Sequence, residues 1–312
     1  MAVSLKGRDF LTIHDWTREE LTQVLDTADL LKLRQKAGLR DRPLEGRSVG
    51  LIFTKPSTRT RVSFEVGVYQ LGAQPIYLSG ADMQLRRGET LADTARTLSR
   101  YLDGIMIRTF AHADVEELAR YADIPVINGL TDWQHPCQVM GDLMTIREKR
   151  GRLDGIHLAY VGAGNNMAHS LLEGGAKFGM RVTVAYPPEY PPDPVVVERA
   201  KADAARSGGS VELFPGDPEA AVAGADVVYT DVWASMGEEA QAEERARRMQ
   251  AFRVTPALMA RAKPDALFMH CLPAHRGEEV VDEVIDGPWS VVWDEAENRL
   301  HVQKAIMALV IA

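Results

Sequence analysis

The sequence predicts an α/β protein of two domains, each a parallel β-sheet flanked by helices. Short apolar runs alternate with amphipathic stretches along the 312 residues, and polar clusters directly follow several of these runs. Alternation of this kind is typical of parallel sheets wrapped by helices. The length is sufficient for two ordinary domains with a large core.

The expected strands are the short apolar runs. Three lie in the first half of the chain: Val49–Phe53, Ile105–Ile107 and Val126–Ile127. Five lie in the second half: Leu158–Val161, Val182–Ala185, Val227–Tyr229, Leu267–Met269 and Val291–Trp293. Ligands of such sheets bind beyond the carboxyl ends of the strands, so polar residues at these ends are candidate site residues.

The division between the domains is expected near residue 140. A helical pattern over Val139–Lys149 precedes Gly151 and a new series of strands, and it is a natural bridge. We expect residues 1–140 to form the first domain and residues 141–295 the second. The stretch Glu297–Ile311 has a helical pattern, so residues 296–312 are expected to pack back on the first domain.

Composition excludes several classes of function. The formal net charge is −8, whereas a protein that binds a nucleic-acid backbone needs a basic surface. Two cysteines are no disulfide framework, which favours a reduced, cytoplasmic protein. The first residues do not read as a signal peptide, and no apolar run approaches the roughly 18 residues of a membrane span.

The first candidate site follows the strand Val49–Phe53. Ser57 is a good N-cap for a helix that begins there, and free N–H groups at a helix start suit phosphate. Thr58 and Thr60 add hydroxyl donors, and Arg59 adds a planar fork matched to phosphate oxygens. The alternative is a capped helix with surface arginines, but this density of hydroxyls and arginines favours an anion site.

Further polar residues of the first half are ambiguous by themselves. Arg108 directly follows a predicted strand and either reaches a ligand or is an ordinary loop arginine. His135 and Gln138 flank Pro136 near a predicted helix start, where an imidazole polarises a carbonyl or only caps the helix. Gln84 lies in a polar loop that composition alone describes as solvated.

The second half opens with a glycine-rich turn that resembles a dinucleotide fingerprint and fails it. After Gly162-Ala163-Gly164-Asn165-Asn166, the third glycine position holds Met167, and the next strand lacks the acid that would bind a ribose. A nicotinamide cofactor is therefore disfavoured. The two amides suit the carboxylate and amine of an amino acid.

Polar or reactive side chains follow two further predicted strands. Asp231 follows Val227–Tyr229 and is a plausible partner for a cationic amine, or a helix cap. His270 and Cys271 follow Leu267–Met269, but neighbours on a strand point to opposite faces, so a simple nucleophilic dyad is not expected. These residues also make a poor zinc site, and no metal is expected.

Five segments carry a resemblance to a known family. Pro56-Ser57-Thr58-Arg59-Thr60-Arg61 followed by Ser-Phe-Glu resembles the carbamoyl-phosphate signature of the aspartate and ornithine carbamoyltransferases. The segments His-Pro-Cys-Gln, Gly-Ala-Gly-Asn-Asn, Ser-Met-Gly and His-Cys-Leu-Pro then resemble, in order, further motifs of that family, so the resemblance covers essentially the whole chain.

The resemblance implies a direct transfer of the carbamoyl group from carbamoyl phosphate to the side-chain amine of ornithine, with no metal or organic cofactor. The implied carbamoyl-phosphate residues are Ser57, Thr58, Arg59, Thr60, Gln84, Arg108, His135, Gln138, Cys271, Leu272 and Arg299. Among these, Arg108, His135, Cys271 and Arg299 are the implied catalytic residues. The implied ornithine contacts are Asn166, Asp231, Ser235 and Met236. The resemblance also implies a homotrimer in which the loop around Gln84 completes the site of a neighbouring subunit.

Other members of this class stay open on the sequence. Aspartate as acceptor would need basic residues for a second carboxylate, where this chain offers Asp231 and the Ser-Met-Gly segment. An acylated ornithine or putrescine is harder to exclude. A non-catalytic carbamoyl-phosphate-binding protein is disfavoured because the motifs are intact in both halves. The sequence does not indicate whether the reaction belongs to arginine synthesis or to arginine breakdown.

Overall fold

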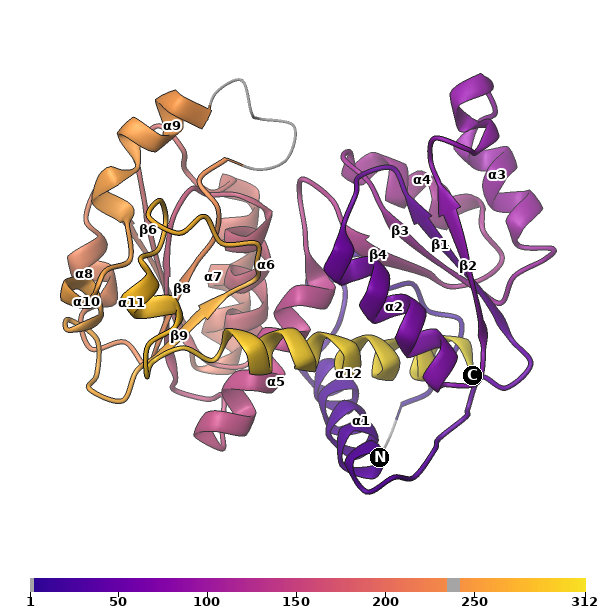
Figure 1. Ribbon diagram of the computed structural model, residues 1–312, viewed down its shortest axis with the longest axis horizontal. Helices are drawn as coiled ribbons and strands as arrows, with labels where there is room; N and C mark the ends of the chain where they lie inside the picture. Colours follow the sequence, from indigo (N-terminus) through magenta and orange to yellow (C-terminus); the bar gives the residue numbers. More distant parts are fainter. Residues whose placement is uncertain (1–2, 235–241) are drawn as a thin grey trace. The chain divides into compact units, whose positions relative to one another are not determined.

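The computed structural model describes residues 3–234 and 242–312, which form two compact units (Figure 1). The first unit comprises Met1–Met144 and Glu297–Ala312, and the second comprises Thr145–Ala296. Each unit is built on one parallel β-sheet flanked by helices, so the predicted fold class is confirmed.

The sheet of the first unit has four parallel strands in the order β2-β1-β3-β4. Their bounds are β1 Ser48–Phe53, β2 Gln74–Ser79, β3 Gly104–Arg108 and β4 Val126–Leu130. The three predicted strands of this half are confirmed, and Arg108 proves to be the last residue of β3. Strand β2 was not predicted: it is a partly exposed edge strand whose short apolar run is preceded by a proline and flanked by polar residues.

Helices cover both faces of this sheet. They are α1 Arg18–Lys36, α2 Thr58–Gln70, the short 3-10 helix η1 Gln84–Arg87, α3 Leu91–Leu98 and α4 His112–Tyr121. Ile52, Ile105 and Ile107 project from one face and pack with Ala95 of α3 and Val115 of α4. On the opposite face, the end of the C-terminal helix lies against Gly104, where an added Cβ would stand 2.6 Å from Ile311.

The sheet of the second unit has five parallel strands in the order β7-β6-β5-β8-β9. Their bounds are β5 His157–Val161, β6 Arg181–Tyr186, β7 Ser210–Pro215, β8 Val227–Thr230 and β9 Leu267–His270. Four of them confirm predicted strands, whereas β7 is a half-buried edge strand that the pattern missed. The chain moves outward from β5 in one direction and then returns to start β8 on its other side. A crevice for ligands is expected at this reversal, between the ends of β5 and β8.

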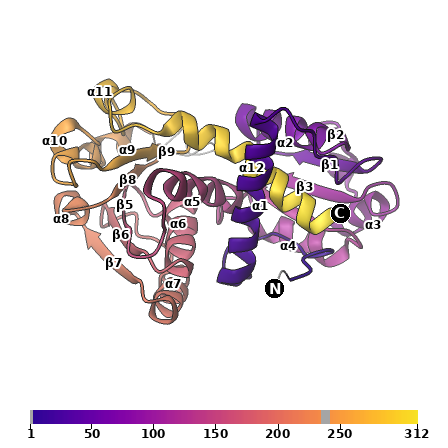
Figure 2. The same ribbon diagram turned by 90° about the horizontal axis from the view of Figure 1, so that it is seen from below.

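Both faces of the second sheet are covered. Figure 2 shows α6 Asn166–Lys177 and α7 Pro194–Ser207 on one face, and α8 Pro218–Val222 on the other. Ala159 and Val161 of β5 pack toward Ala221 and Val222 of α8. The remaining helices are α9 Ala242–Arg248, η3 Gln250–Phe252, α10 Pro256–Met259 and α11 Asp282–Ile285.

Two long helices, α5 Pro136–Arg150 and α12 Val292–Ile311, contribute residues to both units. The predicted strand Val291–Trp293 is wrong, because α12 begins at Val292 and the amide of Glu295 already donates to the carbonyl of Val291. Acidic residues in this first turn favour a helix start. Further along α12, Lys304 donates to Gln35 of α1 and Gln70 of α2, so the C-terminal helix packs back on the first unit.

In the part of the chain that the structure describes, no helix has both the length and the apolar character that a membrane crossing requires.

Candidate functional site

The turn that follows β1 is arranged as an anion site. Ser57 caps α2: its side chain accepts a hydrogen bond from the amide of Thr60 at 3.2 Å, which confirms the predicted cap. The remaining N–H groups of the first helical turn point out of the helix end, where they attract negative charge. Thr58 is exposed and Arg59 partly exposed at this end, so both can be reached by a ligand.

Thr60 is the centre of a buried polar cluster in the first unit. Its hydroxyl oxygen accepts from Arg108 of β3 and from Arg299 of α12, each at 3.2 Å. Arg299 also donates to the amide oxygen of Gln138, whose nitrogen donates to Asp142 at 2.8 Å. A hydroxyl has two lone pairs and one proton, so with both lone pairs engaged Thr60 directs its proton to a further acceptor. This cluster therefore joins four of the predicted site residues from four elements.

His135 lies just before α5, beside these cations, and is almost fully buried. Burial is the main cause that holds the pKa of His135 well below its usual value, and the charges of Arg299 and Arg108 lower it further. Lys55 and Arg59 contribute in the same direction. The imidazole is therefore neutral at physiological pH, and the positive charge of the site resides on the arginines and Lys55.

Lys55 was not singled out from the sequence, because a lysine in a polar turn is unremarkable. In the structure it is only 3% exposed, and its ammonium lies 2.7 Å from Asp132 and 4.9 Å from the ring centroid of Phe110. The ion pair links the turn after β1 to the segment that carries His135.

Gln84 begins the short helix η1 and has an exposed side chain. The structure therefore places it on the surface of its unit, whereas Thr60 is buried.

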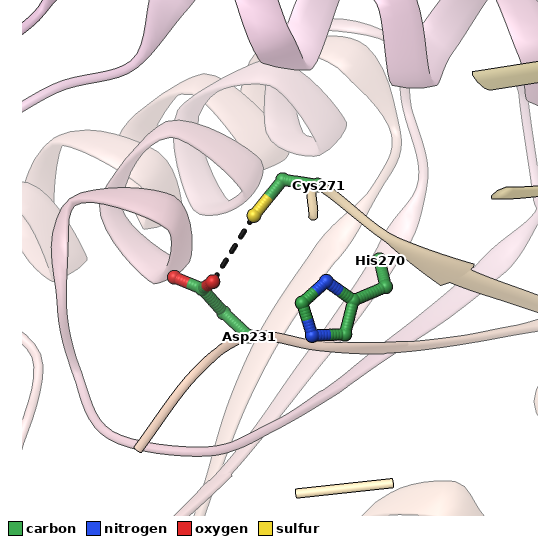
Figure 3. Close-up of side chains that lie close together, drawn as sticks. All are labelled: Asp231, His270 and Cys271. Atoms are coloured by element: carbon green, nitrogen blue, oxygen red, sulfur yellow. Dashed lines mark hydrogen bonds between the residues drawn. The ribbon is translucent and has the colours of Figure 1, made fainter. Parts of the chain in front are cut away.

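The second unit brings Asp231 and Cys271 together. Thr230 of β8 pairs with His270 of β9, so the residues that follow them leave the sheet side by side. The thiol of Cys271 points at the carboxylate of Asp231 and donates to it at 3.0 Å (Figure 3). The expected convergence at strand ends is thus present for these two residues.

Asn165 and Asn166 start α6 beside this pair. Asn166 is buried as the first residue of the helix, and Asn165 is the N-cap. The side-chain nitrogen of Asn165 donates to Asp231 at 2.7 Å, an interaction that the sequence did not indicate. Gly164 permits the turn, because a Cβ there would stand 2.0 Å from the backbone nitrogen of Pro192.

His270 uses different partners from Cys271. Its Nδ1 accepts from the amide of Leu272 at 2.8 Å, so Nε2 carries the proton and donates to the buried Glu279 at 3.1 Å. The bond from Leu272 holds that residue in the left-handed region, at φ 58°. Separate partners for His270 and Cys271 agree with the expectation that they form no dyad.

Among the described residues, two groups of side chains have ligand atoms within 4.8 Å of one another, the spacing of a metal site: Asp231 with His270 and Cys271, and His275 with Glu278 and Glu279. In the first group both ring nitrogens of His270 are already hydrogen-bonded. In the second, two of the three residues are exposed surface side chains. We assign no metal to either group.

The predicted contacts Ser235 and Met236 lie outside the described residues.

Comparisons with known proteins agree with this geometry. Residues 8–148 match the family model described as aspartate/ornithine carbamoyltransferase, carbamoyl-P binding domain, and residues 154–310 match its Asp/Orn binding domain. The chain belongs to the aspartate/ornithine carbamoyltransferase family. The first matched segment carries Thr60, Arg108 and Gln138, and the second carries Arg299 and the Asp231–Cys271 pair.

Individual members of this carbamoyltransferase family are similar over the whole chain. A protein of Symbiobacterium thermophilum named "Ornithine carbamoyltransferase" is 63% identical over 309 residues, which are 99% of each chain. One of Pyrococcus furiosus named "Ornithine carbamoyltransferase, anabolic" is 59% identical over 310 residues, 99% of this chain and 98% of the relative. A solved ornithine carbamoyltransferase from P. furiosus has a TM-score of 0.97 at 59% identity and covers 99% of both chains.

A solved structure with the same fold acts on a different substrate. A solved acetylornithine transcarbamylase complexed with acetylcitrulline has a TM-score of 0.88 at 34% identity, covering 98% of this chain and 99% of that one. The fold alone therefore does not select between ornithine and an acylated ornithine.

Proposed function

We propose that this protein transfers the carbamoyl group of carbamoyl phosphate to the side-chain amine of L-ornithine, giving L-citrulline and phosphate. The observation that carries the proposal is the buried cluster in which Arg108 and Arg299 converge on Thr60 beside a neutral His135. This arrangement concentrates positive charge and hydrogen-bond donors where a dianionic acyl phosphate with a polar carbonyl would be bound. The names of the relatives at 59–63% identity support ornithine as acceptor.

In this proposal the first unit binds carbamoyl phosphate. The start of α2, with Ser57, Thr58 and Arg59, holds the phosphate through free N–H groups, hydroxyls and a guanidinium group. Gln138 holds the carbamoyl NH2, and for the carbonyl of Leu272 in the second unit the same role rests on the family motif alone. These roles rest on the match to the family's motifs and on the cluster geometry.

The same cluster lowers the barrier to transfer. As the amine attacks, negative charge grows on the carbamoyl oxygen, and donors fixed in place before the reaction stabilise it. Thr60 has a proton to donate, and Arg108 and Arg299 add positive charge. Because His135 is neutral, it serves as a hydrogen-bond donor rather than as an acid.

The second unit binds ornithine through Asn166 and Asp231, and we extend the proposal to Ser235 and Met236. Asp231 accepts from Cys271 and Asn165, so its carboxylate is fixed toward the substrate. Only the neutral side-chain amine can attack. Its nitrogen forms a bond to the carbamoyl carbon, and the bond from that carbon to the phosphate oxygen breaks. The amine loses a proton, which the leaving phosphate takes up. Cys271 assists beside the reacting amine.

Other acceptors fit this geometry less well. Aspartate would place a second carboxylate beside Asp231, which like charges disfavour. Putrescine lacks the carboxylate that Asn166 is assigned to bind. Acylated ornithine is the strongest rival, because the solved acetylornithine transcarbamylase shares the fold.

We propose a homotrimer as the working assembly, in which the loop around Gln84 completes a neighbour's site. Its support is a set of exposed apolar side chains on α2 and on the edge strand β2 of the first unit. Val62, Val66 and Tyr69 of α2 and Ile76 and Tyr77 of the edge strand β2 are each at least 37% exposed. Apolar side chains that gather at an open sheet edge mark an interaction surface.

We also propose a cytoplasmic role in arginine biosynthesis. The location rests on the two free thiols, which suit a reduced compartment. The biosynthetic direction rests on the anabolic relative from P. furiosus.

The proposed reaction can be followed directly. Carbamoyl phosphate labelled with ¹³C at the carbonyl, incubated with L-ornithine and the protein, should give one labelled citrulline for each phosphate released. Phosphate release without labelled citrulline would show a hydrolase or a different acceptor. A protein that binds carbamoyl phosphate and releases nothing would be the non-catalytic binder.

A further inference from the structure

We propose that Asn165 is a positioning residue that fixes the carboxylate of Asp231 for the acceptor amino acid. The inference rests on the proposed function, and none of the site roles implied by the motifs includes Asn165. It is carried by the side chains of Asn165, Asp231 and Cys271. These residues follow the three neighbouring strands β5, β8 and β9, where the strand order changes direction.

The two ends of the Asn165 amide have different partners. Its oxygen accepts from the amides of Met167 and Ala168, at 3.0 and 3.1 Å, which caps α6. Its nitrogen donates to Oδ2 of Asp231 at 2.7 Å. Because the helix needs an acceptor, the oxygen cannot turn away, and the nitrogen is held toward Asp231.

The other side of Asp231 is fixed as well. Its Oδ1 accepts from the amide of Val232 at 2.8 Å and from the Cys271 thiol at 3.0 Å (Figure 3). An ionised carboxylate offers about four acceptor positions, so the three bonds leave about one for an N–H of the substrate. Asn165 therefore determines which way that last position faces.

The buried Tyr160 donates a hydrogen bond that holds the side-chain amide of Asn165 in place. Its hydroxyl donates between the carbonyl of Ala163, at 3.0 Å, and the side-chain oxygen of Asn165, at 3.1 Å. Burial is the main cause that raises the pKa of Tyr160 well above its usual value, so this phenol keeps its proton and stays a donor.

The choice of Asn at position 165 distinguishes positioning of Asp231 from capping of α6 alone. Ser, Asp and Asn cap a helix about equally well through an oxygen acceptor. Only Asn among them has an N–H donor on a different atom from the capping oxygen, whereas the single hydroxyl oxygen of Ser serves the cap and an ionised Asp has no proton. Asp at this position would cap α6 and present an oxygen to Asp231, where two carboxylates repel each other.

The experiment compares Asn165→Ser, which keeps a cap and removes the side-chain N–H that reaches Asp231, with Asn165→Asp, which keeps the cap and adds a charge. Asp217→Asn, at the cap of α8, is the matched control. Without the Asn165 donor Asp231 no longer faces the substrate, which then loses a hydrogen bond to a charged group, worth about tenfold or more. The KM for L-ornithine should therefore rise about tenfold in Asn165→Ser and further in Asn165→Asp. The KM for carbamoyl phosphate and the thermal midpoint should stay near those of the unchanged protein and of the control.

A second readout does not depend on turnover. Cys137 is fully buried and burial raises its pKa to about 12, so iodoacetamide at pH 8 reports on Cys271. The added charge in Asn165→Asp should slow alkylation several-fold, because negative charge disfavours the thiolate. The control should alkylate at the original rate.

The outcomes are distinct. If the unchanged protein carbamoylates ornithine, an unchanged KM for ornithine in both Asn165 variants overturns the proposal. A rise of the KM for both substrates together with a fall of the thermal midpoint overturns it as well. If the unchanged protein has no activity with ornithine, the proposed function fails. The alkylation rate of Cys271 is then the only test of the role of Asn165. Slower alkylation in Asn165→Asp then supports the link from Asn165 to Asp231, and an unchanged rate overturns it.

Discussion

The guanidinium group of Arg299 donates to the hydroxyl of Thr60 at 3.2 Å, although 239 residues separate the two in the chain. Arg108 donates to the same oxygen. The helix α12 thus brings a C-terminal arginine to the turn that begins the phosphate site. Thr60 holds the two guanidinium groups at one point, so its hydroxyl should matter for the reaction more than its size.

Thr60→Val tests this relationship, because valine has a similar shape and no hydroxyl. We expect kcat to fall about a hundredfold, the range found when one donor to a developing oxyanion is removed. Thr22→Val on α1 is the control, since that hydroxyl only bonds within its own helix. Steady-state rates of citrulline formation measure the effect. A kcat within threefold of the original would remove the Thr60 hydroxyl from the reaction.

The pH dependence should follow the substrate amine and not His135. A lysine-like amine has a pKa of about 10.4, so on the order of one in a thousand is neutral at pH 7.4. The lowered pKa of His135 keeps its imidazole neutral throughout the assay range, so protonation of His135 becomes important only at more acid pH. At low ornithine, kcat/KM should therefore rise from pH 6.5 to 9. A flat profile would show that deprotonation of the amine does not control the rate.

His301 should make the first unit less stable in acid. Burial is the main cause that lowers its pKa to about 4, and the charges of Lys304 and Lys32 add to the effect. A histidine that is neutral when folded and protonated when unfolded contributes stability above its unfolded pKa, about 6.5. That contribution is lost as pH falls from about 6.5 toward 4, by up to about 3 kcal/mol.

His301→Leu tests this by removing the titration. Calorimetry at pH 7.5 and pH 5 should show a smaller fall of the thermal midpoint in the variant than in the original protein. His275→Leu, at an exposed histidine, is the control and should leave the fall unchanged. An equal fall in His301→Leu and the original protein would contradict the assigned cause.

The proposed sharing of sites between subunits can be tested by mixing. Arg59→Ala and Gln84→Ala proteins should each be nearly inactive as homotrimers. After they are dissociated, mixed and reassembled, some interfaces would pair a normal Arg59 with a normal Gln84, and part of the activity should return. The controls are a clear loss in both parents and proof that subunits exchanged. If each subunit builds its own site, mixing restores nothing.

Much of the sheet structure was predictable because buried parallel strands are continuous apolar runs. The edge strands Gln74–Ser79 and Ser210–Pro215 were missed, since exposed edges carry polar residues and proline. Val291–Trp293 was mistaken for a strand because three apolar residues fit either structure. The acidic residues that follow, Asp294 and Glu295, favour a helix start there, whereas the apolar run does not distinguish the two structures.

The site was predictable only in part. Strand ends and the helix cap pointed to Ser57, Arg108, Asp231 and Cys271. The bond from Asn165 to Asp231 was not predictable, because it depends on which rotamer a capping side chain adopts and on the neighbour that the sheet places beside it. The burial of Lys55 likewise depends on packing that a polar turn does not reveal.

The most direct test of the proposed function is the ratio of kcat/KM values for competing acceptors. The measurement uses saturating carbamoyl phosphate with L-ornithine, N-acetyl-L-ornithine, L-aspartate and putrescine in parallel. A site built to pair the polar groups of one amino acid rejects analogues that leave them unpaired, by about 10⁴-fold in favourable cases. We expect ornithine to exceed each rival by at least about a hundredfold. A higher kcat/KM with any of the other three acceptors would contradict the proposed function.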